Sequence, residues 1–126
     1  MTLYLAAPFA CKIEARLARQ QLFAAGFHVR ASWLDADSDY DDSPRDLEWE
    51  AERDLAEIDE ADAVVVLQLG VSEGKSFETG YAYAIGKVII LVGFNAHNVF
   101  HYLSGIEKVS TLTEAIATLR GGAHVL

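Results

Sequence analysis

The stretch "AVVVLQLGVSEGKSFETGYAYAIGKVIILV", residues 63–92, has the pattern of a strand, a turn, a helix and a second strand. Both ends are β-branched apolar runs, which are typical of strands covered on both faces of a parallel sheet. The middle is polar before it becomes helical, and Gly80, Ala82 and Gly86 keep that helix slim. A strand–helix–strand unit of this kind predicts an α/β fold with parallel strands.

The rest of the chain repeats the same alternation. We expect a single domain over residues 1–126, with a three-layer α/β/α, flavodoxin- or Rossmann-like arrangement around a parallel sheet of about five strands. In such folds ligands bind beyond the carboxyl ends of the strands, so functional residues are expected after Leu5, Trp33 and Leu69. The expected strands cover residues 2–6, 27–33, 63–69, 88–92 and 107–110, and the expected helices cover 12–25, 46–61, a segment capped by Ser76, and 112–120.

Composition and cysteine content favour a soluble protein of the cytoplasm. The chain has 126 residues, 52% of them hydrophobic, and no apolar run approaches the roughly 20 residues of a membrane helix. The opening "MTLYLAAPF" has no basic leader, so it is expected to form the first strand. A lone cysteine, Cys11, fits a reducing compartment. We therefore expect a cytoplasmic protein without a membrane partner.

The charge distribution argues against nucleic-acid binding. The net charge is −9, and residues 34–62 hold 14 of the 19 acidic side chains. Binding to DNA or RNA depends on clustered lysine and arginine that neutralise phosphates. Residues 34–46 are expected to form an acidic surface loop. A small nucleoside or nucleotide in a local pocket remains compatible with this charge.

Two carboxylates are badly placed for a purely structural role. Asp54 falls inside the apolar stripe of its helix, whereas the other acids of that helix, Glu57 among them, fall outside it and are expected on a solvated face. A carboxylate in such a stripe needs a partner or a cleft. Glu78 is expected in the first turn of a helix that follows a buried strand, at the ligand-binding edge of the sheet.

Four segments together resemble the nucleoside 2-deoxyribosyltransferase family. They are "LYLAAPF", "DLAEIDEADAVVVL", "GKSFETGYAYAIGKVIILV" and "HNVFHYLSG", which run in this order from Leu3 to Gly105. The resemblance implies an enzyme that cleaves or exchanges the N-glycosidic bond of a nucleoside or nucleoside 5′-monophosphate. Chemically this suits two carboxyl groups in distinct surroundings, because the departing base needs a proton and the sugar needs a nucleophile or a stabilising charge.

The resemblance also implies residue roles. Glu78 matches the family's nucleophile and Asp54 the acid near the base. Tyr4 matches the tyrosine that positions the nucleophile, and a neutral Tyr4 hydroxyl is expected to leave Glu78 ionised. Asn98 matches a residue that reaches a neighbouring subunit's site, so at least a homodimer is expected. The further substrate-binding candidates are Ser72, Gly74, Ser76, Pro8 and Phe9.

No cofactor is expected. His97 and His101 flank Asn98 without the spacing of a metal site, so packing or interface roles are favoured over zinc.

Ser72 departs from the transferase pattern, in which an aspartate stands six residues before the nucleophile. A serine there resembles the relatives that hydrolyse nucleoside 5′-monophosphates, where it touches phosphate. Lys12, Arg16 and Lys75 are the candidate cations for a phosphate, although each is expected to be an ordinary surface residue. Because of the serine at position 72, hydrolysis is favoured over base exchange. Two alternatives stay open: a non-catalytic nucleotide-binding or sensing module of the same fold, and a protein-interaction domain that uses the acidic loop.

Overall fold

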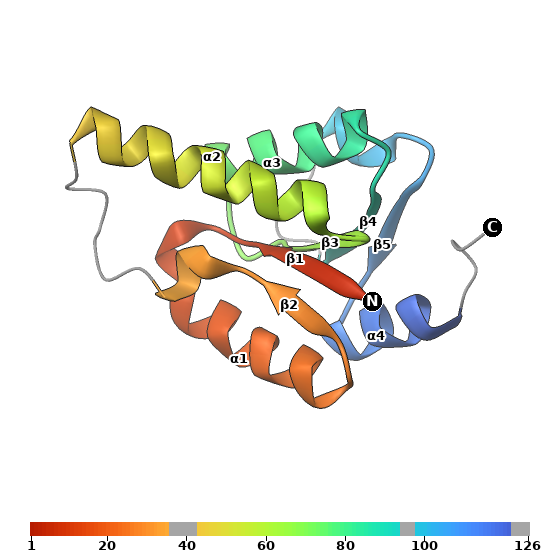
Figure 1. The fold of residues 1–126 in the computed structure, drawn as a ribbon. Helices are drawn as coiled ribbons and strands as arrows, with labels where there is room; N and C mark the ends of the chain where they lie inside the picture. Colours follow the sequence, from red (N-terminus) through yellow and green to blue (C-terminus); the bar gives the residue numbers. More distant parts are fainter. Residues whose placement is uncertain (36–42, 94–97, 122–126) are drawn as a thin grey trace.

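The computed structural model describes residues 1–35, 43–93 and 98–121. Its five strands form one parallel sheet in the order β2-β1-β3-β4-β5 (Figure 1). This is the order of flavodoxin-like folds, in which the chain reverses its direction of winding between β1 and β3. The predicted parallel α/β sheet is therefore confirmed. The strands are β1 (Thr2–Ala6), β2 (His28–Arg30), β3 (Ala63–Leu67), β4 (Val88–Val92) and β5 (Ile106–Val109).

Within the described residues, four α-helices cover the two faces of the sheet. Figure 1 shows α2 (Pro44–Glu60) and α3 (Glu73–Ala84) on one face, and α1 (Lys12–Ala24) and α4 (Leu112–Gly121) on the other. The three-layer α/β/α arrangement is thereby confirmed. That one domain extends over all of residues 1–126 stays a prediction.

The core lies around the central strands. Every residue of β3 is buried, because β1 and β4 flank it and helices cover both of its faces. Large side chains such as Leu3, Leu5 and Ile89 are fully buried, and each contributes about 1.5–3 kcal/mol by leaving water. This packing holds the carboxyl ends of β1 and β3 side by side, since the two strands pair in parallel register from Leu3 opposite Ala63 to Ala6 opposite Val66.

The second strand is shorter than predicted. The sequence predicts a strand over 27–33, but β2 ends at Arg30 and residues Ser32–Asp35 form a 3₁₀ turn. Trp33 anchors this turn, because its indole Nε1 donates a hydrogen bond of 2.9 Å to the carbonyl oxygen of Leu5 at the end of β1. Most of the predicted acidic loop, residues 36–42, lies outside the described residues.

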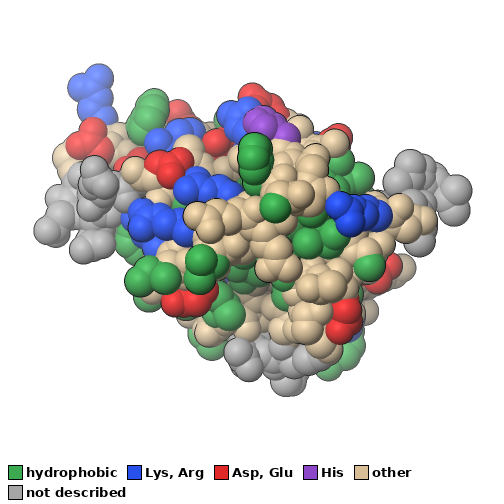
Figure 2. Space-filling model, turned by 90° about the horizontal axis from the view of Figure 1, so that it is seen from below, with side chains coloured by type: hydrophobic (Ala, Val, Ile, Leu, Met, Phe, Trp, Pro, Cys, Tyr) green, Lys and Arg blue, Asp and Glu red, His purple; other side chains and the backbone are tan. Residues whose placement is uncertain are grey.

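The surface seen from the α1 and α4 side mixes side chains of both charges with hydrophobic ones (Figure 2). None of the helices in the described residues is long and apolar enough to cross a membrane. Within the same residues no group of three or more His, Cys, Asp or Glu side chains is arranged to hold a metal ion.

Candidate active site

The start of α3 differs from the prediction. Ser72, not Ser76, is the N-cap: its Oγ accepts a hydrogen bond of 3.2 Å from the backbone N–H of Lys75. Both serines are good capping residues and they stand one turn apart, so the local pattern does not choose between them. Because the helix begins at Glu73, Glu78 lies in its second turn and not its first.

Glu78 meets Tyr4 across 74 positions of sequence. The Tyr4 hydroxyl, fully buried on β1, donates a hydrogen bond of 2.6 Å to Oε2 of Glu78. Burial raises the pKa of Tyr4 far above its usual value, and the neighbouring Glu78 and Asp54 raise it further. Tyr4 is therefore a neutral donor at any physiological pH, and it fixes one oxygen of the Glu78 carboxyl.

The expectation that Tyr4 leaves Glu78 ionised is wrong for the free protein. Burial is the largest influence and raises the pKa of Glu78 to about 8, and the hydrogen bond from Tyr4 lowers this pKa only in part. Asp54 and Glu57 raise it further by charge repulsion. The Glu78 carboxyl is thus mostly protonated at neutral pH.

Asp54 on α2 and Glu78 on α3 line the same cavity. This cavity has a volume of about 380 Å³. The Oδ1 atom of Asp54 is buried and has no hydrogen-bond partner in the described part of the chain. Burial raises the pKa of Asp54 to about 6, although the nearby Arg53 opposes this shift. A buried, unpaired carboxyl oxygen is costly, so its position at a cavity is consistent with a ligand as its partner.

Apolar side chains form most of the wall of this cavity, which we call the glutamate cavity. Phe9 and Trp33 stand together, with ring centroids 6.4 Å apart. The only polar atom of the Trp33 ring is already bonded to Leu5, so this wall offers flat hydrophobic surface suited to a planar base. The remaining lining residues are Ala7, Ala51, Leu55, Ser72, Gly74, Lys75 and Phe77.

The predicted binding residues divide between two cavities. Ser72, Gly74 and Phe9 line the glutamate cavity, and Pro8 is buried beside two of its lining residues. A Cβ atom at Gly74 would meet only Ser72 Oγ, at 4.0 Å, so no described neighbouring atom requires a glycine at this position.

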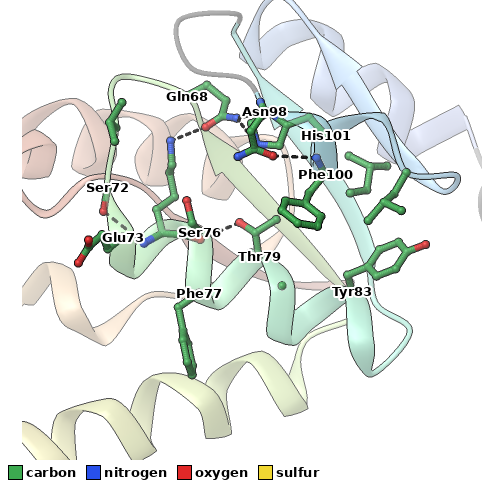
Figure 3. Close-up of a pocket in the computed structure, with 15 residues that line it drawn as sticks. Gln68, Ser72, Glu73, Ser76, Phe77, Thr79, Tyr83, Asn98, Phe100 and His101 are labelled. Atoms are coloured by element: carbon green, nitrogen blue, oxygen red, sulfur yellow. Dashed lines mark hydrogen bonds between the residues drawn. The ribbon is translucent and has the colours of Figure 1, made fainter.

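Ser76 and Asn98 instead line a second cavity of about 690 Å³ on the other side of α3. Ser72, Lys75 and Phe77 border both cavities. In Figure 3, Asn98, His101 and Gln68 gather at one end of the second cavity, while Phe77 extends away from them toward α2.

Asn98 opens the 3₁₀ helix Val99–Tyr102. Its side-chain oxygen accepts a hydrogen bond of 2.9 Å from the backbone N–H of Phe100, and Nδ1 of His101 accepts one of 3.3 Å from the backbone N–H of Asn98. His101 is buried and also lies 3.2 Å from the Gln68 amide nitrogen. His101 thus has the predicted packing role, while His97 lies outside the described residues.

Lys75 contradicts its expected place on the surface. It is only 4% exposed, and its ammonium donates to the side-chain oxygen of Gln68 and, at 2.7 Å, to the carbonyl oxygen of Gly70. The sequence gives little sign of this, because a lysine in the first turn of a helix is ordinarily solvated. Arg16, in contrast, is exposed and donates to the carbonyl oxygen of Leu34, while the Lys12 ammonium lies 4.4 Å from the centre of the Phe9 ring.

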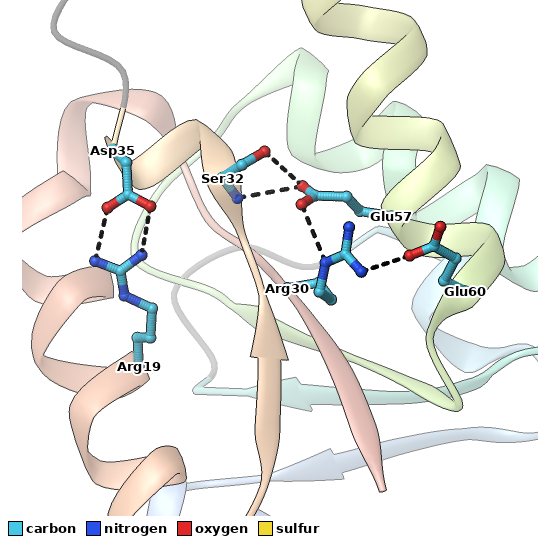
Figure 4. Close-up of polar contacts among 6 residues, drawn as sticks. All are labelled: Arg19, Arg30, Ser32, Asp35, Glu57 and Glu60. Atoms are coloured by element: carbon cyan, nitrogen blue, oxygen red, sulfur yellow. Dashed lines mark hydrogen bonds and ion pairs between the residues drawn. The ribbon is translucent and has the colours of Figure 1, made fainter.

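Glu57 also contradicts its expected solvated position. It is 4% exposed and accepts hydrogen bonds from the backbone N–H and the hydroxyl of Ser32, at 3.2 and 2.8 Å. Arg30 bridges Glu57 and Glu60, as Figure 4 shows. These contacts tie α2 to the turn that carries Trp33, so Glu57 supports one wall of the glutamate cavity.

The sequence from residue 3 to residue 119 matches the family model of nucleoside 2-deoxyribosyltransferases. The chain belongs to this family. The predicted resemblance is thereby confirmed over most of the chain. The family is one of enzymes, and membership in it supports deoxyribosyl transfer or N-glycosidic bond cleavage as the class of reaction.

Solved structures of two proteins share the fold. A 2-deoxyribosyltransferase from Bacillus psychrosaccharolyticus superposes with a TM-score of 0.77 and 20% identity, over 94% of this chain and 96% of that one. A CMP N-glycosidase from Clostridium botulinum gives a TM-score of 0.63 and 22% identity, over 95% and 98% of the two chains. At this identity the likeness concerns the fold. A search of curated proteins found no match.

Proposed function

We propose that this protein cleaves the N-glycosidic bond of a nucleoside or nucleoside 5′-monophosphate, with Glu78 as nucleophile and Asp54 as acid. The observation that carries the proposal is the glutamate cavity itself. Two carboxyl groups from different helices, one held by Tyr4 and the other without a partner in the described residues, line one cavity whose walls are mostly apolar. Carboxyl pairs of this kind perform glycosidic bond cleavage in many enzymes.

In the first step, an oxygen of Glu78 attacks the anomeric carbon while the bond from that carbon to the base nitrogen breaks. The bonding electrons leave with the base, and Asp54 donates a proton to it. Tyr4 holds Oε2, so we assign Oε1 as the attacking atom. The product is a glycosyl ester on Glu78.

In the second step, water attacks the anomeric carbon of this ester. The ionised Asp54 accepts a proton from the water, and Glu78 leaves as a carboxylate. The sugar is released with a hydroxyl at the anomeric carbon, and both carboxyl groups return to their starting state. A second base in place of water would give base exchange.

We favour water as the acceptor. Ser72 stands where the transferase pattern has an aspartate, and it lines the glutamate cavity. A neutral hydroxyl there lacks the charge that an aspartate would present to an incoming base. Hydrolysis and base exchange share the first step and differ in the acceptor of the second. The proposal favours water as that acceptor.

The raised pKa values have a consequence for the pH dependence. The reactive form needs Glu78 ionised and Asp54 protonated, the reverse of their order of titration at about 8 and about 6. At pH 7 that form is therefore a minor one. We expect a bell-shaped profile of kcat/KM with limbs near pH 6 and 8, and a lower apparent pKa of Glu78 once a sugar cation develops beside it.

We also propose a homodimer in which Asn98 lies near the neighbouring subunit's site. The exposed apolar side chains that follow Asn98 in the sequence support this, since a cluster of exposed hydrophobic residues commonly marks a protein interface. They are Val99, Phe100, Tyr102 and Leu103. We further expect the protein to act in the cytoplasm, on the sequence argument from its single cysteine.

The test is a chromatographic screen of the purified protein and of Glu78→Ala against ribo- and deoxyribonucleosides and their 5′-monophosphates, with and without a second free base. Free base released without an acceptor by the wild type alone supports the hydrolase. Product only with an acceptor supports a transferase. Equal silence of both proteins contradicts catalysis, and binding of the same compounds would then favour the non-catalytic sensing module.

A further inference from the structure

The ammonium group of Lys75 belongs to the second cavity, the one of about 690 Å³. Lys75 borders both cavities, but its ammonium is bonded to Gln68, which is buried and lines only the second cavity. Figure 3 shows Gln68 at one end of this cavity, beside His101. The proposed reaction uses the glutamate cavity, so it leaves the second cavity without a role.

Lys75 is a buried cation whose bonded partners are neutral. Its ammonium donates to the side-chain oxygen of Gln68 and to the carbonyl oxygen of Gly70, and no carboxylate in the described residues forms an ion pair with it. Burial lowers the pKa of Lys75, which reflects the cost of keeping a charge out of water. An ammonium has three donors, so one donor stays available to a ligand beside Gln68.

The other polar groups near this end of the cavity are also compatible with an anion. The Ser76 side chain lines only the second cavity, and its hydroxyl has no hydrogen-bond partner in the part of the chain that the structure describes. Glu73 is the one acid among the lining residues. It is exposed, and in Figure 3 it points away from Gln68 and His101.

The remaining walls are largely apolar. Phe100, Leu103 and Tyr83 line the cavity and are all exposed, and Ile106 lines it between them and the sheet edge. A volume of about 690 Å³ is in the range of small-molecule sites, which are mostly apolar with a few polar groups. The cavity therefore suits a ligand with an apolar body and one negatively charged end.

The charge of the site favours a carboxylate as that end. Lys75 is the only lysine or arginine among the lining residues, so it offers a single positive charge. A carboxylate carries one negative charge, whereas a phosphate monoester carries about 1.5–2 at pH 7 and would bring an excess into a mostly apolar site.

We infer that the second cavity binds a small monocarboxylic acid with an apolar body. The Lys75 ammonium and the Ser76 hydroxyl donate to its carboxylate, and Phe100 and Leu103 contact its apolar part. The inference goes beyond the proposed function, because it concerns a different cavity and needs neither Glu78 nor Asp54. The ligand supplies the negative charge that the protein itself does not place beside Lys75.

The experiment compares 3-phenylpropionate with 3-phenylpropionamide, a neutral probe of nearly the same shape. Isothermal titration calorimetry measures both affinities for the wild type and for Lys75→Met. Lys87→Met is the matched control, since it removes the same charge from a lysine that lines neither cavity and bonds to the Asp59 carbonyl.

Two further variants decide which cavity is occupied. Gly80→Leu places a side chain in the second cavity, and a Cβ atom at this position meets no described atom within 4 Å. Leucine is also a better helix former than glycine, so this variant is expected to fold. Ala51→Leu is its counterpart, because Ala51 is exposed and lines only the glutamate cavity.

We expect the wild type to bind the carboxylate about 10- to 100-fold more tightly than the amide, the range for hydrogen bonds to charged groups. Lys75→Met should lose most of this ratio, and Lys87→Met should keep it. Gly80→Leu should lose binding of both probes, whereas Ala51→Leu should bind them as the wild type does.

A wild-type ratio near one, or no binding of either probe, overturns the inference whether or not any variant folds. So does a folded Lys75→Met protein that keeps the ratio, or loss of binding in Ala51→Leu but not in Gly80→Leu. Sedimentation of the wild type and Gly80→Leu tests the rival occupant. A dimer that becomes monomeric in Gly80→Leu would show that a second copy of the chain fills the cavity, against the inference. None of these readouts depends on base release.

Discussion

Asp54 and Glu57 lie three residues apart on α2, and their surroundings differ in one decisive respect. Glu57 is buried among donors, with Ser32 and Arg30 bonded to its two oxygens. Asp54 has a buried oxygen without any partner in the described residues, and it lines a cavity. A buried carboxylate with partners is a structural element, whereas one without partners beside a cavity is a candidate for chemistry.

The largest expected effect is on catalytic activity, for which Asp54 is expected to matter more than Glu57. Asp54→Asn removes the proposed acid with little change in shape, so kcat/KM should fall by about 10²- to 10⁴-fold. Glu57→Gln changes the neighbouring acid in the same way and should cost no more than about tenfold. Initial rates of base release measure both. Equal losses in the two variants would break the distinction between them.

The second prediction concerns stability, for which Glu57 is expected to matter more than Asp54. Glu57→Ala leaves Ser32 and Arg30 without their shared acceptor, so the free energy of unfolding should fall by about 2–3 kcal/mol. Asp54→Asn removes a charge that burial disfavours and should leave stability equal or higher at pH 8. Urea unfolding monitored by circular dichroism gives both values. An Asp54→Asn protein that is as unstable as Glu57→Ala would show that Asp54 also has a structural partner.

The third prediction concerns the pH dependence of stability. Because the pKa of Glu78 is raised from 4.5 to about 8, the folded state binds more protons than the unfolded state between these values. Stability should therefore decrease as pH rises from 4.5 to 8, by an amount on the order of 2 kcal/mol after allowance for solvent. In Glu78→Gln the part of this decrease between pH 6 and 8 should largely disappear, whereas the part below pH 6, to which the raised pKa of Asp54 also contributes, should remain. An unchanged slope in the variant would mean that Glu78 is ionised in the free protein.

The smallest effect is expected from Tyr4→Phe. Loss of the hydroxyl removes the hydrogen bond that lowers the pKa of Glu78, so that pKa should rise further and the carboxylate should lose its fixed orientation. We expect kcat/KM to fall about tenfold, with the limb assigned to Glu78 at higher pH. A pH–rate profile measures both effects. A limb that moves to lower pH would contradict the assigned hydrogen bond.

The sequence predicts the fold well because its signals are local. Apolar runs, helix stripes and turn residues repeat through the chain, so the parallel α/β sheet and most element positions follow from them. The same local reasoning singles out Asp54, because a carboxylate interrupts an apolar stripe. The pairing of Tyr4 with Glu78 is different, since it joins residues 74 positions apart and was expected only from the family resemblance.

The errors concern side chains whose partners the periodic pattern of one helix does not reveal. Glu57 is buried by contacts with Ser32 and Arg30, about 25 residues away, and the helix pattern alone contains no trace of them. Lys75 is buried by its bonds to Gln68 and Gly70, which lie seven and five residues earlier, in the turn that follows β3. The sequence alone does not distinguish Ser72 from Ser76 as the helix cap, because the choice depends on the path of the turn before them.

The central claim is that Glu78 forms a bond with the sugar. The most direct measurement is mass spectrometry of the acid-quenched protein during a single turnover, followed by peptide mapping. The account predicts an added mass of one sugar unit, with its phosphate where the substrate carries one, on the peptide that contains Glu78. Asp54→Asn should still form this adduct, more slowly. Base release with the adduct on another residue, or with no adduct at any time during the turnover, would contradict the account.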